Sequence, residues 1–399
     1  MDKKILFEKI EALYPWLVEV RRDFHRHPEL GMEEYRTRDQ IVKYLKEMGV
    51  ETKADIAKTG VVGLIRGGSP GRTIALRADM DALPMQDEKN APYKSTVDGK
   101  MHSCGHDAHM TILLGTAKIL SGIRNQLKGN VKLLFQPAEE TVGGAKPMIE
   151  EGVLENPPVD GVLGLHVSTE DPTGTIGVRY GQMNAASDGI KIILHGESTH
   201  GAYPHSGVDA IAMAGQVITA LQTVVSRNVD PRDSAVVTLG TIQGGTKQNI
   251  ISNRVEMTGT VRTLDPKTRS KVIDRVEKIV LQIAAAMGGK GEVLREEGYT
   301  ALINDDEMVH LVRDTGKELL GEDNVLEVKH ATLGVEDFAY FAAAVPGAFF
   351  KLGCRNEEKG SIYDGHTTLF DIDEEALKVG VAMQVSNVLR FLKQGLANK

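Results

Sequence analysis

Six consecutive segments decide how the middle of the chain folds: GIKIILHG (189–196), DAIAMAGQVITALQTVVS (209–226), AVVTLGTI (235–242), RVEMTGTVRTL (254–264), KTRSKVIDRVEKIVLQIAAAM (267–287) and GEVLREE (291–297). Their patterns predict strand, helix, strand, strand, helix and strand, in that order. Asp265 and Pro266 stand where the second helix needs an N-cap and a first-turn proline, and Gly288 and Gly289 follow its end. This order of elements is that of a ferredoxin-like α+β unit.

The sequence on either side of this unit predicts a different order of strands and helices. Apolar, strand-like runs such as RTIAL (72–76) and VKLLF (131–135) alternate with helical patterns. Such alternation predicts an α/β fold, with a mostly parallel sheet and helices on both faces. A chain of 399 residues is longer than one hydrophobic core usually serves. We therefore predict a discontinuous α/β domain of residues 1–181 and 298–399, with residues 182–297 inserted as a second domain.

The composition excludes several classes of protein. A formal net charge of −8, without a continuous run of Lys and Arg, argues against a nucleic-acid binder. Charged residues interrupt the amphipathic N-terminal segment too often for a signal peptide, and no stretch is apolar for the roughly 18 residues that a membrane span needs. Only Cys104 and Cys354 are present, which fits a reducing compartment. We expect a cytoplasmic protein that binds neither nucleic acid nor membranes.

Residues 102–109, HSCGHDAH, gather one thiol, three imidazoles and one carboxylate within a single short segment. These are the ligand types that borderline metals such as zinc prefer. A single histidine is more often an ordinary surface or core residue than a ligand, but its clustering with a cysteine and an aspartate reverses that balance. Cys104 is therefore interpreted either as a metal ligand or as a nucleophile.

Further polar side chains follow other predicted strands. Glu139 and Glu140 come after VKLLF, two aspartates come after RTIAL, and His166 and His366 lie within or beyond two more strand ends. Each of these, taken alone, is also explained by a solvated loop or a satisfied core histidine. Their convergence is the evidence, because open α/β sheets place active sites at the carboxyl ends of their strands. One of the adjacent glutamates can then bind a metal while the other takes a proton from water.

These residues carry a resemblance that covers essentially the whole chain. The sequence resembles the dinuclear metallo-amidohydrolases that include aminoacylases, hippurate hydrolases, N-acetyldiaminopimelate deacetylases and plant auxin-conjugate hydrolases, a branch of the metallo-aminoacylase and carboxypeptidase family. The matching segments are FHRHPEL (24–30), RADMDALP (77–84), HSCGHDAH (102–109), LLFQPAEE (133–140), LHV (165–167), NIISNRVEMTGTVRT (249–263), GVEDFAYF (334–341) and DGHT (364–367). Larger relatives have a carboxylate bridge and a histidine where this chain has Cys104 and Asp79, so these two positions decide the branch.

The resemblance implies a site and a chemistry. Two divalent metal ions per subunit, Zn, Mn, Co or Ni, are expected on Cys104, His106, Glu140, His166 and His366. The Cys104 thiolate is expected to bridge them, Glu139 to act as general base and later as acid, and Asp81 to orient a ligand from behind. By the same resemblance the ions activate water and polarise the substrate carbonyl.

The resemblance also makes the inserted domain a lid and dimerisation domain. His200 matches a histidine that reaches the active site, often across a dimer interface, to stabilise a tetrahedral oxyanion. Asn249 and Arg262 match substrate-binding positions, and the guanidinium of Arg262 suits an α-carboxylate. Without the resemblance, His200 would be interpreted as a loop histidine beside His205. A homodimer or a higher homo-oligomer is expected.

These patterns support one expected function and leave four alternatives. The expected reaction is metal-dependent hydrolysis of the amide bond of small N-acyl-L-amino acids, which releases a carboxylic acid and a free amino acid. An N-acetyldiaminopimelate-type deacetylase or a small-peptide hydrolase would use the same site. A cysteine hydrolase with Cys104 as nucleophile would leave Glu140, His166 and His366 without a role. A metal-binding protein without turnover is the non-enzymatic alternative, and the presence of Glu139 argues against it.

Overall fold

The chain forms two compact units. The computed structural model describes residues 1–395. The first unit consists of Met1–Gly181, Ile303–His330 and the segment from Asp337 onward, and the second consists of Gln182–Leu302 and Ala331–Glu336.

The segment Ala331–Glu336 lies in the stretch that the sequence assigns to the α/β domain, yet it packs with the second unit. The reason is main-chain pairing, since Thr332 N donates to Met183 O and Ala185 N donates to Gly334 O. Residues 396–399, the end of the stretch assigned to the α/β domain, lie outside the described residues.

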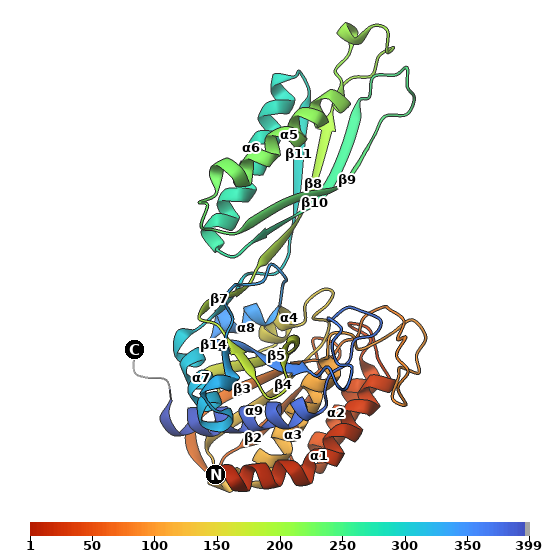
Figure 1. Cartoon of the computed structure of the whole chain (residues 1–399). Helices are drawn as coiled ribbons and strands as arrows, with labels where there is room; N and C mark the ends of the chain where they lie inside the picture. The colour runs from red at the N-terminus through yellow and green to blue at the C-terminus, as the bar shows by residue number, and fades with distance from the viewer. Residues whose placement is uncertain (396–399) are drawn as a thin grey trace. The chain divides into compact units, whose positions relative to one another are not determined.

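An eight-stranded sheet lies at the centre of the first unit (Figure 1). In spatial order its strands are β1 (Glu51–Ile56), β2 (Gly60–Arg66), β4 (Lys128–Gln136), β3 (Ser69–Asp79), β5 (Gly161–Pro172), β14 (Gly347–Arg355), β6 (Ile176–Val178) and β13 (Val325–Glu327). The central strands β4, β3, β5 and β14 are parallel. β1 and β2 pair antiparallel with their neighbours, whereas β6 pairs antiparallel with β14 and parallel with β13. Burial of the central strands on both faces explains their continuous apolar runs. β7 (Gly181–Asn184) and β12 (Leu302–Asn304) form a separate two-stranded sheet.

Helices cover both faces of the eight-stranded sheet, as predicted. They are α1 (Lys3–Arg26), α2 (Tyr35–Glu47), α3 (His106–Gly122), α4 (Ala145–Glu150), α7 (Asp306–Leu320), α8 (Phe338–Ala344) and α9 (Glu375–Gln394). Two glycines of β5 point to opposite faces: a Cβ at Gly161 would meet α9 and α7, and a Cβ at Gly164 would meet Phe338 of α8. Because α1 and α3 pack with α9, and α4 packs with α8, the long helices cover one face and the short ones the other.

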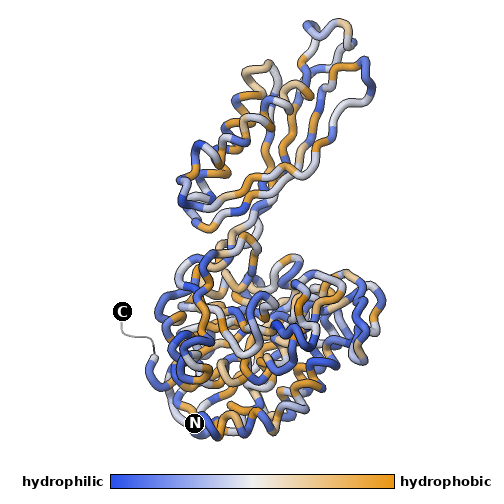
Figure 2. Tube along the Cα trace, in the orientation of Figure 1, coloured by the Kyte–Doolittle hydropathy of each residue, from blue (hydrophilic) through white to orange (hydrophobic). Residues whose placement is uncertain are grey.

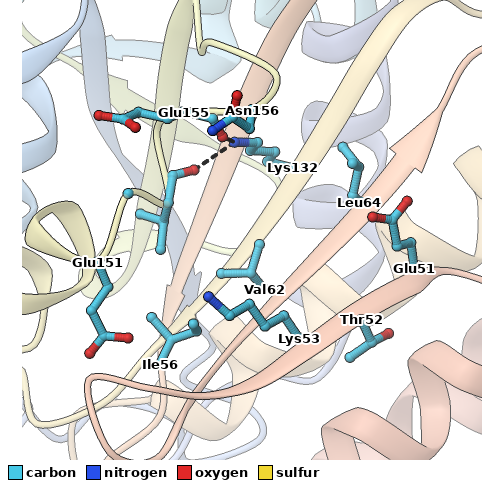
Figure 3. A pocket seen from close by; sticks show the side chains of 12 residues that line it. Glu51, Thr52, Lys53, Ile56, Val62, Leu64, Lys132, Glu151, Glu155 and Asn156 are labelled. Atoms are coloured by element: carbon cyan, nitrogen blue, oxygen red, sulfur yellow. Dashed lines mark hydrogen bonds between the residues drawn. The ribbon is translucent and has the colours of Figure 1, made fainter.

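A cavity of about 340 Å³ lies over β1, β2 and β4, between the sheet and the segment that follows α4 (Figure 3). Its floor includes Leu64 and the buried Lys132, whose Nζ donates to Val153 O at 2.8 Å and also to Glu155 O. Burial lowers the pKa of Lys132 to about 8. Since the ammonium is used on these two carbonyls, Lys132 holds the segment after α4 against the sheet.

The second unit is an α+β unit with the predicted order of elements. Its antiparallel strands lie in the order β11 (Lys290–Glu297), β8 (Ala186–His195), β10 (Arg254–Thr263) and β9 (Ala235–Gly244). The helices α5 (Ala210–Asn228) and α6 (Pro266–Ala286) pack on one face of this sheet (Figure 1). Apolar and polar residues alternate along both helices in Figure 2, as one buried face requires. Asp209 and Asp265 cap them by accepting hydrogen bonds from first-turn amides.

None of the helices in residues 1–395 combines the length and the apolar character needed to cross a bilayer.

Candidate metal centre

The carboxyl ends of the parallel strands bring the predicted metal ligands together within the first unit. β4 leads directly into Glu139 and Glu140, and His166 lies within β5. α3 begins at His106, while His366 lies in the segment between β14 and α9. These segments are far apart in the sequence, so the shared sheet edge, and not local sequence, creates the site.

Two groups of ligand atoms share the thiol of Cys104. Cys104, His106 and His166 place their ligand atoms within 4.8 Å of one another, and so do Cys104, Glu140 and His366. The Cys104 Sγ atom lies 3.3 Å from His166 Nε2, and His366 Nε2 lies 3.0 Å from Glu140 Oε1. A thiol common to both groups is the arrangement that a ligand shared by two cations requires.

Glu139 lies beside these groups. Its carboxylate is within 4.8 Å of ligand atoms of His106 and Glu140, and the residue is buried, with 8% of its surface exposed. The two adjacent glutamates therefore face the same small region. Glu140 forms a group with Cys104 and His366, whereas Glu139 does not.

The backbone fixes the tautomers of two of the histidines. His106 Nδ1 lies 2.8 Å from Asp81 O, and His166 Nδ1 lies 2.7 Å from Val167 O. A carbonyl oxygen only accepts hydrogen bonds, so each ring carries its proton on Nδ1 and directs the lone pair of Nε2 elsewhere. Nε2 of His106 is buried and finds no hydrogen-bond partner in the described part of the chain. Nε2 of His106 thus presents an unused lone pair, which is what a metal ligand requires, and Nε2 of His166 lies beside the Cys104 thiol.

The electrostatics of the site favour a cation. Burial raises the pKa of the Cys104 thiol well above its usual range. Burial alone would lower the pKa of His106, but the negative charge of Asp79 outweighs it and raises that pKa. A positive charge is therefore stabilised among these side chains, and a thiolate needs one beside it. The nitrogen, oxygen and sulfur donors fit a divalent ion of the borderline class.

Two buried carboxylates hold the loop that carries the glutamates. The amides of three consecutive residues donate to them: Ala138 N to Glu34 Oε1 at 2.9 Å, Glu139 N to Asp81 Oδ1 at 3.1 Å and Glu140 N to Asp81 Oδ2 at 3.0 Å. Ala138 has a φ of +56°, which L residues rarely adopt. The loop is thus held in a strained conformation by side chains from elsewhere. Asp81 thereby accepts from the amides of both adjacent glutamates.

Glu34 is a residue that sequence reasoning missed. It accepts a second hydrogen bond from Thr59 Oγ1 at 2.6 Å, and burial raises the pKa of its carboxyl group to about 7. Glu34 stands in the acidic run Glu33–Glu34 just before α2, which resembles an ordinary surface segment. The only local signal is its place in a segment next to FHRHPEL, and that does not reveal its contact with Ala138.

Backbone conformation also positions Cys104, His106 and His366. Gly105 has a φ of +86°, and a Cβ there would lie 2.3 Å from Val167 Cγ2, so only glycine allows Cys104 and His106 to approach β5. His366 has a φ of +62°, and its amide donates to Ser103 O at 2.8 Å. A non-glycine residue in the left-handed region costs free energy and is typical of functional sites.

The predicted residues of the inserted domain lie in the second unit. His200 and Asn249 line a cavity of about 440 Å³ together with Ser198, Thr199, Lys247 and Ile250. Ala202 N donates to His200 Nδ1 at 3.0 Å, so the neutral ring carries its proton on Nε2 and can donate it. Arg262 is not grouped with these residues, since it lies within β10, opposite Ser187 of β8 and Val236 of β9.

Comparison with known proteins finds relatives along nearly the whole chain. The model of peptidase family M20/M25/M40 matches residues 75–390. Thermostable carboxypeptidase 1 of Saccharolobus solfataricus is 40% identical over 386 residues, which cover 96% of this chain and 97% of that protein. The N-acetyl-L-cysteine deacetylase of Bacillus subtilis is 42% identical over 368 residues, which cover 92% of this chain and 86% of that protein.

A solved structure shows the same fold. The YXEP protein of Bacillus subtilis, a dinuclear metal binding peptidase from the M20 family, superposes with a TM-score of 0.84 at 35% sequence identity. The match covers 96% of this chain and 99% of that protein. On the family match and these identities along nearly the whole length, the chain belongs to peptidase family M20/M25/M40.

Proposed function

We propose that this protein hydrolyses the amide bond of small N-acyl-L-amino acids with the help of two divalent ions. The observation that carries the proposal is the thiol of Cys104, which is shared by two ligand groups of the first unit, one with His106 and His166 and one with Glu140 and His366. Zn, Mn, Co and Ni all suit such a set of donors. The ions would be held by Cys104, His106, Glu140, His166 and His366.

The names of relatives support the substrate class. One relative is a deacetylase of N-acetyl-L-cysteine and another is a carboxypeptidase. Both names describe hydrolysis of an amide whose leaving amine belongs to an amino acid. A deacetylase for another acetylated amino acid, or a hydrolase for small peptides, would use the same residues. The acyl group and the amino acid side chain distinguish these possibilities.

Glu139 is the residue we assign to proton transfer. When bound, the two ions would lower the pKa of water and polarise the substrate carbonyl. Glu139 is buried beside the ligand groups, and its amide is fixed by Asp81. A carboxylate so placed can accept a proton from water and later donate it to the leaving amine. Asp81 is a positioning residue, because it holds both glutamate amides and its carbonyl sets the tautomer of His106.

His200 is the residue we assign to the oxyanion. Its Nδ1 accepts from Ala202 N, which leaves Nε2–H as a donor without any change of protonation. A fixed donor aimed at a developing negative charge lowers the barrier of acyl transfer. Asn249 shares the cavity with His200 and is assigned to substrate binding. We assign Arg262 to the substrate carboxylate, on the fit of guanidinium to carboxylate.

Removal of metal tests the proposed function. Treatment with a chelator is expected to abolish hydrolysis of acetyl-, benzoyl- and longer acyl-amino acids, and adding Zn, Mn, Co or Ni singly is expected to restore it, because the reaction needs a cation to activate water. A panel of these substrates, assayed with each ion, measures both the metal requirement and the preferred acyl group. Hydrolysis that persisted after complete metal removal would favour Cys104 as a nucleophile.

We further propose that the second unit pairs with its copy in a symmetric homodimer. β9 is an edge strand of its sheet, and Ile242 on β9 and Ile211 on α5 are 55% and 51% exposed. Exposed edges and apolar side chains of this kind invite pairing. Sedimentation at micromolar concentration is expected to give twice the chain mass of 43.4 kDa. Ile242→Lys is expected to weaken the dimer, and a parent protein that sediments as a monomer would contradict the pairing.

A further inference from the structure

Both ring nitrogens of the buried His109 make hydrogen bonds. His109 lies in the first turn of α3, three residues after His106, and is 2% exposed. Its Nδ1 is 2.6 Å from Asp79 Oδ1, and its Nε2 accepts a hydrogen bond from Val167 N at 3.0 Å. An amide N–H only donates, so Nε2 must be the unprotonated nitrogen and Nδ1 must carry the proton toward Asp79. With both nitrogens used, His109 has no lone pair left for a metal.

The Val167 amide needs this acceptor because the sheet does not supply one. The pairing of β3 with β5 ends at Arg77 and Gly164. Beyond that point, an N–H of β5 that points toward β3 has no carbonyl of β3 to bond to. A buried N–H without a hydrogen bond would cost free energy. The ring of His109 supplies the missing acceptor at Val167.

Val167 connects His109 to the ligand His166. The amide of Val167 is held by His109, and the carbonyl oxygen of Val167 accepts from His166 Nδ1 at 2.7 Å. The two rings also pack edge to face, with centroids 4.7 Å apart. A shift of the Val167 peptide would therefore rotate the His166 ring and move its Nε2 away from Cys104 Sγ.

Asp79 fixes the tautomer of His109 from the other side. Its second carboxylate oxygen accepts from Arg77 Nη1 at 2.7 Å, and Arg77 in turn donates to Asp337 at 3.0 Å and to Gln136 at 2.8 Å. All of these side chains are buried. The network holds Asp79 in place as an acceptor for the proton of His109 Nδ1.

We propose that His109 is a positioning residue of the metal centre: its Nε2 lone pair holds the Val167 amide, and through it the His166 ring, while Asp79 keeps the proton on Nδ1. The inference rests on the proposed metal site and adds to it a residue that binds no metal itself. It also gives a role to Asp79.

Two substitutions at position 109 separate the two hydrogen bonds. In His109→Gln the side-chain carbonyl reaches the place of Nε2 and still accepts from Val167 N. In His109→Asn the shorter amide keeps a donor near Nδ1 but leaves Val167 N without an acceptor. After removal of metal, each variant is titrated with Co²⁺, with its spectrum and metal content recorded. We expect His109→Asn to lower the affinity for one of the two Co²⁺ ions by about 10–100-fold. The affinities of His109→Gln are expected to stay within about threefold of those of the parent.

His102 provides a matched control for the change in side-chain volume when a buried histidine is replaced with Gln or Asn. It is buried in the same segment, 1% exposed, and neither of its ring nitrogens has a hydrogen-bond partner in the described residues. The Gln and Asn variants at position 102 are therefore expected to bind Co²⁺ alike. Equal binding by the two position-109 variants would overturn the role of His109, and a parent protein that binds no Co²⁺ would overturn the metal site as well.

A measurement on the parent protein needs no variant to fold. Nitrogen NMR of protein labelled with ¹⁵N-histidine is expected to show His109 as the neutral Nδ1–H tautomer between about pH 6 and pH 8, where an ordinary histidine titrates. A proton on Nε2 of His109 would rule out the hydrogen bond from Val167 and with it the proposal.

Discussion

Replacing Glu139 with Gln is expected to slow hydrolysis of N-acyl amino acids by at least about 10²–10⁴-fold while both metal ions stay bound. Glutamine keeps the size of the side chain and most of its hydrogen bonds, but it lacks a basic oxygen. The loop should keep its shape, because the Glu139 amide binds Asp81 through the backbone. Single-turnover rates with saturating substrate measure the chemical step, and elemental analysis of the same sample measures the ions.

Glu140→Gln is the matched control, since it makes the same chemical change one residue further along the chain. The Glu140 carboxylate belongs to the ligand group of Cys104 and His366, so a neutral amide there removes an anionic ligand and should weaken metal binding directly. If Glu139→Gln lost its ions while Glu140→Gln kept them, the two roles would have to be exchanged. Full turnover by Glu139→Gln would contradict the proposed proton transfer.

The order of elements in the second unit could be predicted because its signals are local. Hydrophobic periodicity marks α5 and α6, and Asp209 and Asp265 cap them within their own first turns. The assignment of Ala331–Glu336 could not be predicted in this way. It depends on backbone hydrogen bonds to residues 183–185, and such bonds leave no side-chain pattern in the sequence.

The residues of the candidate site also differ in whether local sequence signals reveal them. Residue types and strand ends indicate Cys104, His166 and the glutamates, and the resemblance completes the predicted set. Glu34 and His109 act through backbone amides, of Ala138 and Val167 respectively, so their roles depend on which N–H the sheet leaves unpaired. That information exists only once the strands have their register. The carboxylates and imidazoles that hold the ligands are therefore harder to find from sequence than the ligands themselves.

Cys104→Ala is expected to lose both metal ions, whereas His166→Ala and His366→Ala are each expected to lose mainly one. The reason is the membership of the two ligand groups: Cys104 belongs to both, His166 to the first and His366 to the second. Removing a shared ligand takes a negative charge from two cations at once, while removing one histidine leaves the other group with its donors. Equilibrium dialysis against Zn²⁺ or Co²⁺, followed by elemental analysis, gives the number of ions per subunit for each variant.

The metal contents of the three variants distinguish a bridging thiol from a cysteine nucleophile better than activity does. A cysteine nucleophile also predicts an inactive Cys104→Ala protein. That alternative requires the inactive variant to keep the parent's full metal content. A bridging thiol requires the opposite, and it also requires the two histidine variants to lose different ions, which competition between Zn²⁺ and Co²⁺ can resolve by spectrum. If Cys104→Ala lost only the ion that His166→Ala loses, Cys104 would be an ordinary ligand of one ion, and the shared group would have to be assigned to another residue.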